Sequence, residues 1–202
     1  MDIREVTSVA DIILTGVAEK PDAEMLVIGD ERITWAEMRD RAGQVANALR
    51  ASGVGPQERI AYIDKNGAEY FELAFGCSLA NSVTVAVNWR LAPPEMAYIV
   101  NDAQSKVLVI HEEFADHLAA FEADLTHTDT ILVIGDHDTH ASYAGWRDAH
   151  SPDCEITPAG GDDVSMQLYT SGTTGLPKGA QLTNDNFKTL FQVVEWQMDD
   201  DS

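Results

Sequence analysis

The sequence predicts an α/β protein built on a parallel, doubly wound sheet that is flanked by helices. Two observations lead to this prediction: β-branched apolar runs recur between residues 59 and 134, and helical patterns separate them. Strands that alternate with helices are joined by crossover connections, which place the strands parallel in one sheet. The 202 residues are 45% hydrophobic, which is enough for one large domain or for one and a part.

The first predicted element is an amphipathic helix that begins after Thr34. Thr34 and Glu37 match the capping-box pattern, and apolar side chains then recur at helical spacing until Gly53 ends the helix. These apolar side chains are Trp35, Met38, Ala42, Val45, Ala46 and Leu49.

Four strands and three further helices are predicted between this helix and residue 150. Asn66 is expected to cap a helix that runs through Leu79, Pro93 and Pro94 open another, and residues 114–125 form a third helical stretch. The predicted strands, each a short apolar run, are residues 59–63, 83–87, 107–110 and 131–134.

A polar segment rich in proline and glycine, residues 151–163, predicts a connection between subdomains. It divides the chain into a first α/β subdomain, residues 1–150, and the start of a second one, residues 164–202. An apolar strand is predicted over 164–170 and a helix over 184–198. One face of that helix is apolar and comprises Phe187, Leu190, Phe191, Val194 and Met198.

A short stretch after the strand at 164–170 combines hydroxyl side chains, glycines and one lysine. The hydroxyl side chains are Thr170, Ser171, Thr173 and Thr174, and the glycines are Gly172, Gly175 and Gly179. Glycines let a backbone turn sharply and bring its N–H groups against an anion, while hydroxyls donate hydrogen bonds. Pro177 stiffens the exit and Lys178 adds a positive charge. Each charge-assisted contact contributes about 1.5–3 kcal/mol, so the stretch predicts a polyphosphate-binding loop.

Three better-known sites do not fit this stretch. A Walker loop ends in Gly-Lys-Ser/Thr, whereas Lys178 stands between Pro177 and Gly179, and the spacing of Gly172 and Gly175 is not that of a dinucleotide-binding fingerprint. Ser171 lacks the Gly-x-Ser-x-Gly context of a hydrolase nucleophile. A P-loop kinase, a Rossmann dehydrogenase and a serine hydrolase are therefore not favoured.

The net charge of −21, from 34 acidic and 13 basic residues, opposes binding to nucleic acids or anionic lipids. Lys178 and Lys188 are the only basic residues after Ser151, among nine acidic ones, so Lys178 is interpreted as placed for an anion. The two cysteines give neither a disulfide framework nor a metal-binding spacing. The N-terminus lacks a signal-peptide pattern, and no apolar run is long enough for a transmembrane helix. A cytoplasmic protein is expected.

One other segment invites a metal hypothesis. Residues 135–140 contain two histidines and two aspartates in a predicted loop after a strand. The spacing of His137 and His140 matches no helical ligand pair, and a surface turn explains the composition equally well. No metal site is therefore predicted.

Residues 169–179 resemble the phosphate-binding signature of the adenylate-forming ligases, the superfamily of acyl-CoA synthetases, peptide-synthetase adenylation domains and luciferases. Further motifs follow in the order and spacing of fatty-acyl-CoA synthetases, so the resemblance covers most of the chain. They comprise residues 33–38, Arg41 and Ala42, residues 53–55, residues 59–61, Asn66, residues 87–91 and Glu95. Asn184 is a departure, because many relatives carry histidine there.

The resemblance implies an incomplete N-terminal domain of an AMP-forming acyl-CoA synthetase. Such an enzyme activates a fatty acid or related carboxylate with ATP and Mg²⁺ to acyl-AMP and transfers the acyl group to CoA. It also implies which residues hold the ATP phosphates, namely Thr170, Ser171, Gly172, Thr173, Thr174, Gly175 and Lys178. The family places the acyl pocket, the adenine and ribose contacts, a metal-binding glutamate and a C-terminal domain after this region. The chain therefore has no complete catalytic set, and alone it is expected to be inactive.

Two alternatives remain open on the sequence. The chain can be a non-catalytic truncated module that keeps the phosphate loop as a fold element, or part of a peptide-synthetase-type adenylation domain. The apolar face of residues 184–198 normally needs a covering domain, so an uncovered face predicts dimerisation. The acyl substrate is not determined by these residues.

Overall fold

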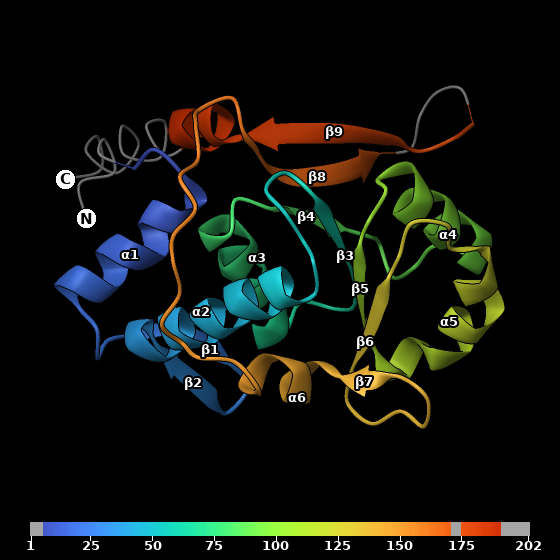
Figure 1. Cartoon of the computed structure of the whole chain (residues 1–202), viewed down its shortest axis with the longest axis horizontal. Coiled ribbons are helices and arrows are strands. Elements are labelled where there is room, and N and C mark those ends of the chain that lie inside the picture. The colour runs from blue at the N-terminus through green and yellow to red at the C-terminus, as the bar shows by residue number, and fades with distance from the viewer. Residues whose placement is uncertain (1–5, 171–174, 191–202) are drawn as a thin grey trace.

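A computed structural model, which describes residues 6–170 and 175–190, contains one seven-stranded sheet with helices on both faces (Figure 1). The strand order is β7-β6-β5-β3-β4-β8-β9, and a separate hairpin, β1-β2, lies at one side. The strands are β1 Glu24–Ile28, β2 Glu31–Thr34, β3 Arg59–Ile63, β4 Val83–Ala86, β5 Val107–His111, β6 Thr130–Ile134, β7 Ala141–Ser142, β8 Val164–Thr170 and β9 Lys178–Thr183.

The doubly wound sheet predicted from the sequence is confirmed, but it is mixed and not wholly parallel. Strands β7 to β8 of the sheet order run parallel, whereas β9 is antiparallel to β8. A parallel return needs a crossover of a dozen or more residues, and only residues 171–177 separate β8 from β9. The glycine-rich stretch therefore joins two strands of a hairpin, where the sequence led us to expect the helix at 184–198 as the next element after the strand.

Two helical layers cover the sheet, and strand side chains alternate between them. Ala61 and Ile63 of β3 pack under α4 and α5, whereas Ile60 and Tyr62 pack under α2, α3 and α6. Both faces of the central strands are buried, which is why β3 and β5 are almost continuously apolar. The helices are α1 Val9–Glu19, α2 Trp35–Ala51, α3 Ala68–Leu79, α4 Pro93–Asp102, α5 Ala115–Phe121 and α6 Tyr143–Asp148, with 3₁₀ turns η2 Glu112–Phe114 and η3 Glu122–Asp124.

The capping box of α2 is confirmed: the Glu37 backbone N–H donates to Thr34 Oγ1 at 3.2 Å, and Thr34 N–H donates to Glu37 Oε2 at 2.8 Å. The cap of α3 differs from the prediction, because Gly67 and not Asn66 occupies the N-cap position. Helix α1, the β1-β2 hairpin, α6 and the short strand β7 were not predicted. The helix predicted over 184–198 does begin at Asn184 and is described as far as Leu190; its remainder lies outside the described residues.

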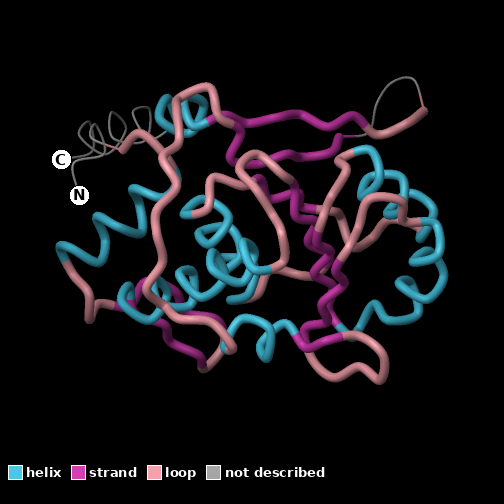
Figure 2. Tube along the Cα trace, viewed as in Figure 1, coloured by secondary structure: helices cyan, strands magenta, loops and turns pink. Residues whose placement is uncertain are grey.

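Residues 151–163 form an extended connection without secondary structure, which crosses α2 on its way from α6 to β8 (Figure 2). Arg39 and Asn47 of α2 donate hydrogen bonds to backbone carbonyls of this segment, at 2.9 Å to Pro152 and 2.8 Å to Ser151. Gly43 faces the same carbonyl of Pro152, leaving no room for a side chain. The segment is thus fixed to α2, and β8 then pairs with β4 of the same sheet. The division into two subdomains here stays a prediction.

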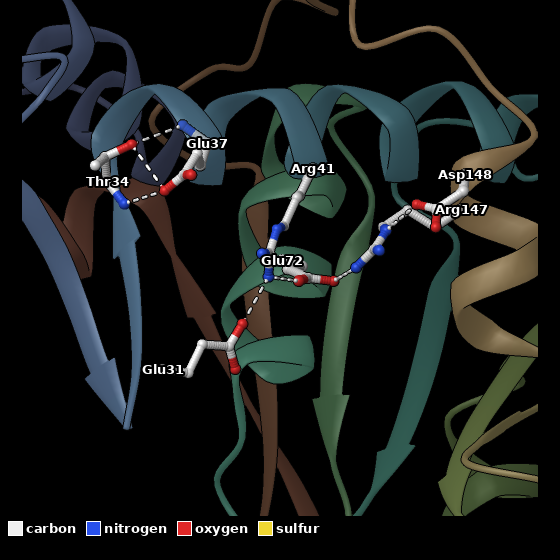
Figure 3. Close-up of polar contacts among 7 residues, drawn as sticks. All are labelled: Glu31, Thr34, Glu37, Arg41, Glu72, Arg147 and Asp148. Atoms are coloured by element: carbon white, nitrogen blue, oxygen red, sulfur yellow. Dashed lines mark hydrogen bonds and ion pairs between the residues drawn. The ribbon is translucent and has the colours of Figure 1, made fainter. Parts of the chain in front are cut away.

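A buried carboxylate connects helices α2, α3 and α6, which cover the same face of the sheet (Figure 3). Glu72 of α3, whose side chain is 1% exposed, lies 3.0 Å from Arg41 of α2 and 2.6 Å from Arg147 of α6. Arg41 also contacts Glu31 at 3.2 Å, and Arg147 contacts Asp148 at 2.8 Å. Because two guanidinium groups surround it, the carboxylate is buried without being left unpaired.

We predict that Glu72→Ala lowers the free energy of unfolding by about 3–5 kcal/mol, because it leaves two guanidinium groups without their buried partner. Glu31→Ala is the matched control: it removes another carboxylate from Arg41, but an exposed one, and is expected to cost less than about 1 kcal/mol. Urea denaturation followed by circular dichroism measures both. Equal losses in the two variants would contradict the interpretation.

The two cysteines, Cys77 and Cys154, are free and differ in burial. Burial raises the pKa of the Cys77 thiol to about 11, so it stays protonated at neutral pH. We predict that a thiol reagent at pH 8 labels Cys154 in the folded chain and Cys77 only after denaturation. Mass spectrometry of the labelled peptides checks this, and rapid labelling of Cys77 in native protein would refute it.

None of the helices within the described ranges is both long and apolar enough to traverse a lipid bilayer.

Candidate nucleotide-binding site

Strands β8 and β9 flank the glycine-rich stretch, and we call the end of the hairpin at Thr170 and Lys178 the hairpin mouth. Thr170 ends β8 and Lys178 begins β9, and the two residues are direct cross-strand partners. Direct partners project their side chains from the same face of a sheet, so the Thr170 hydroxyl and the Lys178 ammonium group lie on one side of the mouth. Ser171, Gly172, Thr173 and Thr174 lie outside the described residues.

The two described glycines of the stretch have different roles. Gly175 has φ +101°, a conformation that L side chains rarely adopt, so it permits the predicted sharp turn. Gly179 is not a turn residue, because it lies inside β9. A Cβ on Gly179 would meet Gln167 Nε2 at 2.5 Å and Tyr169 Cζ at 3.0 Å. Glycine is required there because neighbouring side chains of β8 lie across the backbone of β9.

A cavity of about 270 Å³ lies beside the hairpin mouth, between it and α4. The first turns of α4 contribute Glu95 and Ile99, and the hairpin contributes Thr170 and Gly175. The complete lining is Asn88, Leu91, Glu95, Ile99, Tyr169, Thr170, Gly175 and Pro177. Thr170 and Gly175, two of the proposed phosphate-binding residues, thus line the same cavity as Asn88 and Leu91 of the loop after β4.

A larger crevice of about 620 Å³ opens at the carboxyl ends of β3 and β4. The chain leaves β3 for α3 on one face of the sheet and leaves β4 for α4 on the other, so the two connections diverge. Ligands of open α/β sheets bind in the crevice that such a divergence creates. Its lining is Tyr62, Asp64, Lys65, Asn66, Tyr70, Ala86, Val87, Asn88, Trp89 and Arg90.

Cationic and aromatic side chains gather in this crevice. The Arg90 guanidinium lies 4.1 Å from the centre of the Trp89 ring, and Lys65 Nζ lies 5.3 Å from it. Lys65 pairs with Glu113 at 2.6 Å, whereas Arg90 has no carboxylate partner within the described ranges. In a chain with 34 acidic residues, an unpaired arginine on a tryptophan is a candidate contact for an anionic ligand.

Sequence reasoning assigned no role to Trp89 and Arg90. Residues 87–91 follow directly after a predicted strand, which is where ligand-binding residues of such sheets lie. Only the sheet order shows that this strand, β4, is one of the two whose connections leave on opposite faces. Burial, followed in size by the influence of the nearby Asp64 carboxylate, raises the pKa of Tyr62 in the same crevice well above its ordinary value. Its hydroxyl therefore stays protonated and donates to Asp64 Oδ2 at 3.2 Å.

The loop at 135–140 does not assemble a metal site. His140 Nε2 lies 2.9 Å from Glu122, and His137 Nδ1 accepts the backbone N–H of Thr139 at 3.3 Å. In the part of the chain that the structure describes, no group of three or more His, Cys, Asp or Glu side chains is placed to hold a metal ion.

Residues 15–202 match the family described as AMP-binding enzyme. The chain belongs to the AMP-binding enzyme family. This confirms the resemblance to adenylate-forming ligases that the glycine-rich stretch indicated.

Proteins similar to this chain include ligases of several carboxylic acids. The chain is 33% identical to a fatty acid–[acyl-carrier-protein] ligase of Streptomyces coeruleorubidus over 90% of its length, and 37% identical to a feruloyl-CoA synthase of Amycolatopsis sp over 82%. The crystal structure of an anthranilate CoA ligase in complex with anthranoyl-AMP superposes with a TM-score of 0.84 and 27% identity over 88% of the chain. The chain spans only 35%, 31% and 35% of these three proteins, about a third of their length.

We predict that Gly175→Ala lowers the free energy of unfolding by at least about 1 kcal/mol, because alanine does not tolerate the positive φ at this position. Gly145→Ala is the matched control, since that glycine lies within α6 and an added Cβ would meet Ser142 Cβ no closer than 3.9 Å. It should stabilise by about 0.5–1 kcal/mol through helix propensity. Chemical denaturation measures both variants, and a stabilising Gly175→Ala would contradict the assigned conformation.

Proposed function

We propose that the chain is the N-terminal part of an AMP-forming ligase that activates a fatty acid or related carboxylate with ATP and transfers the acyl group to CoA. The observation that carries the proposal is the hairpin mouth, where Thr170 and Lys178 face each other at the carboxyl edge of the sheet in a member of the AMP-binding enzyme family. The names of the similar proteins, which are acyl ligases, support this function over a non-catalytic module or a peptide-synthetase adenylation domain.

In this proposal the hairpin holds the β- and γ-phosphates of ATP. The residues assigned to them are Thr170, Ser171, Gly172, Thr173, Thr174, Gly175 and Lys178. A carboxylate oxygen attacks the α-phosphorus, the bond from that phosphorus to the bridging oxygen breaks, and pyrophosphate leaves with the electron pair. Lys178 and the hydroxyls stabilise the charge that develops on the leaving pyrophosphate. No general base is required, because the attacking carboxylate is already ionised at neutral pH.

The second half-reaction needs a thiol acceptor. A CoA thiol attacks the acyl carbonyl carbon, gives up its proton, and displaces AMP. We assign the anionic part of CoA to the crevice at β3 and β4, because Arg90 offers a charge without a carboxylate partner and Trp89 an aromatic face. One similar protein is named for an acyl-carrier protein in place of CoA, so a carrier protein is the second candidate acceptor.

Mg²⁺ is expected to accompany ATP in such a ligase. The cavity beside the hairpin has one carboxylate, Glu95, and the described ranges contain no cluster of three metal-binding side chains. Mg²⁺ is commonly held through substrate phosphates and only one or two carboxylates. The described residues alone therefore do not make a magnesium site, and no step above depends on one.

The acyl pocket and the other catalytic groups belong to a C-terminal region of the same enzyme, and residues 164–202 begin the subdomain that continues into it. An exposed Leu190, at 54%, is consistent with a helix face that another domain or a second copy covers. A cytoplasmic location completes the proposal, in keeping with two free cysteines.

The test is pyrophosphate release by the intact protein with ATP, CoA and a series of fatty and aromatic carboxylates. Lys178→Ala is expected to raise the KM for ATP about 10- to 100-fold, the equivalent of one lost charge-assisted contact. Lys188→Ala, which removes the other lysine of this region, should leave the KM unchanged. The 202-residue chain alone should form no acyl-CoA.

Three results would overturn the proposal: no carboxylate-dependent pyrophosphate release by the intact protein, equal effects of the two lysine variants, or acyl-CoA formation by the chain alone. Replacing CoA with an acyl-carrier protein in the same assay separates the two acceptors. An Arg90→Ala variant should raise the KM for CoA and not that for ATP.

A further inference from the structure

Three polar side chains from α4 and β8 form a continuous hydrogen-bond chain beneath the hairpin. The Tyr169 hydroxyl donates to Asp102 Oδ2 at 2.6 Å, and Gln167 Nε2 donates to the Tyr169 hydroxyl at 2.9 Å. Asp102 is the last residue of α4, whereas Gln167 and Tyr169 lie two residues apart on the same face of β8. The chain of hydrogen bonds therefore joins the end of a helix to the strand that leads into the phosphate loop.

Gly179 of β9 is the point where this hydrogen-bond chain meets the second strand of the hairpin. Gly179 is the direct cross-strand partner of Tyr169, and its missing side chain leaves the space that Gln167 Nε2 and the Tyr169 ring occupy. The next pair along the hairpin is Thr170 with Lys178. Whatever fixes the Tyr169–Gly179 pair thus also fixes which residue of β9 faces Thr170.

Hydrophobic burial specifies this register only weakly. Residues 178–181 of β9 are exposed, Leu182 and Thr183 are half-buried, and β9 is an edge strand of the sheet. Register is weakly specified in strands that lack a buried face, and a slip of one residue turns every side chain to the opposite face. Such a slip would move Lys178 away from the face on which the Thr170 hydroxyl lies. Polar side-chain contacts must therefore help to specify the register if Thr170 and Lys178 are both to contact the phosphates.

The buried amide of Gln167 makes the register of β8 and β9 depend on the Tyr169 hydroxyl. Gln167 is 5% exposed, and its Oε1 has no hydrogen-bond partner within the described residues. Its Nε2 is held by the Tyr169 hydroxyl. Loss of that hydroxyl would leave both ends of a buried amide unpaired, which costs more than the loss of an exposed hydrogen bond. Burial and the Asp102 carboxylate, in that order, raise the pKa of Tyr169, so the hydroxyl keeps its proton.

We propose that Asp102 and Tyr169 are positioning residues for the phosphate hairpin. Asp102 fixes the Tyr169 hydroxyl, Tyr169 and Gln167 pack on the bare backbone of Gly179, and this contact sets the register that places Lys178 beside Thr170. That the hairpin binds the phosphates of ATP rests on the proposed function, but the register itself does not.

The first test is hydrogen–deuterium exchange of the 202-residue chain, which needs no ligand. In Tyr169→Phe, peptides that cover 178–183 should exchange about tenfold faster, while peptides from β3 and β5 keep their protection. Tyr98→Phe is the matched control, because Tyr98 packs on the same core from α4 and its hydroxyl makes no hydrogen bond to Gln167, Asp102 or Tyr169. It should leave the exchange of 178–183 unchanged.

A second variant approaches the same contact from β9. Gly179→Ala should accelerate exchange of 178–183 as Tyr169→Phe does, since a methyl group would displace Gln167 and Tyr169. Gly145→Ala, an open position in α6, should not. Unchanged protection of 178–183 in both test variants, or an equal acceleration across the whole sheet, would overturn the positioning role.

The intact ligase supplies a readout that a merely structural role would not change. Asp102→Ala should raise the KM for ATP about tenfold with the KM for CoA unchanged, and Asp102→Asn, which keeps an acceptor for Tyr169, should restore most of it. A parallel rise in both constants, or no rescue by asparagine, would contradict the proposal. If the intact protein shows no ligase activity, the proposed function fails while the exchange experiment still decides the positioning role.

Discussion

The pairing of β3 with β4 on one side and β5 on the other is the constraint on which the rest of the structure depends. The chain moves from β3 to its neighbour β4 and then returns across β3 to reach β5, so α3 and α4 must lie on opposite faces. The connections after β3 and β4 diverge as a consequence, and the crevice that contains Arg90 opens between them. The free edge of β4 then receives β8, which brings the glycine-rich hairpin to the same end of the sheet.

The cationic side chains of the chain differ in the partners that the fold gives them. The chain is strongly acidic, and its arginines mostly serve structure, as Arg41 and Arg147 do around Glu72. Lys178 and Arg90 have no carboxylate partner within the described residues, and both lie at the carboxyl edge of the sheet. A cation without a carboxylate partner keeps its full charge available to attract an anionic ligand. The proposed division of ATP and CoA between hairpin and crevice uses this separation.

The glycine-rich stretch shows how far a local pattern can be interpreted. Its composition predicted an anion-binding turn, and Gly175 does adopt the positive φ that such a turn requires. Gly179 was interpreted in the same way, but it is a strand residue that accommodates Gln167 and Tyr169 of its partner strand. The sequence could not distinguish these two roles, because glycine is required both where the backbone adopts a positive φ and where neighbouring side chains approach the backbone closely. Only the register of β8 and β9 separates the two.

The sequence by itself determined the elements whose periodicity and caps are local: the capping box at Thr34, the buried strands β3 and β5, and the strand that ends at Thr170. It also determined the family, because residues 169–179 form a contiguous motif. Tertiary structure decided the antiparallel direction of β9, the partners of Glu72, and the meeting of Trp89 and Arg90 with Lys65. These depend on contacts between residues far apart in the chain, and local pattern carries no information about which distant strand or helix a residue will meet.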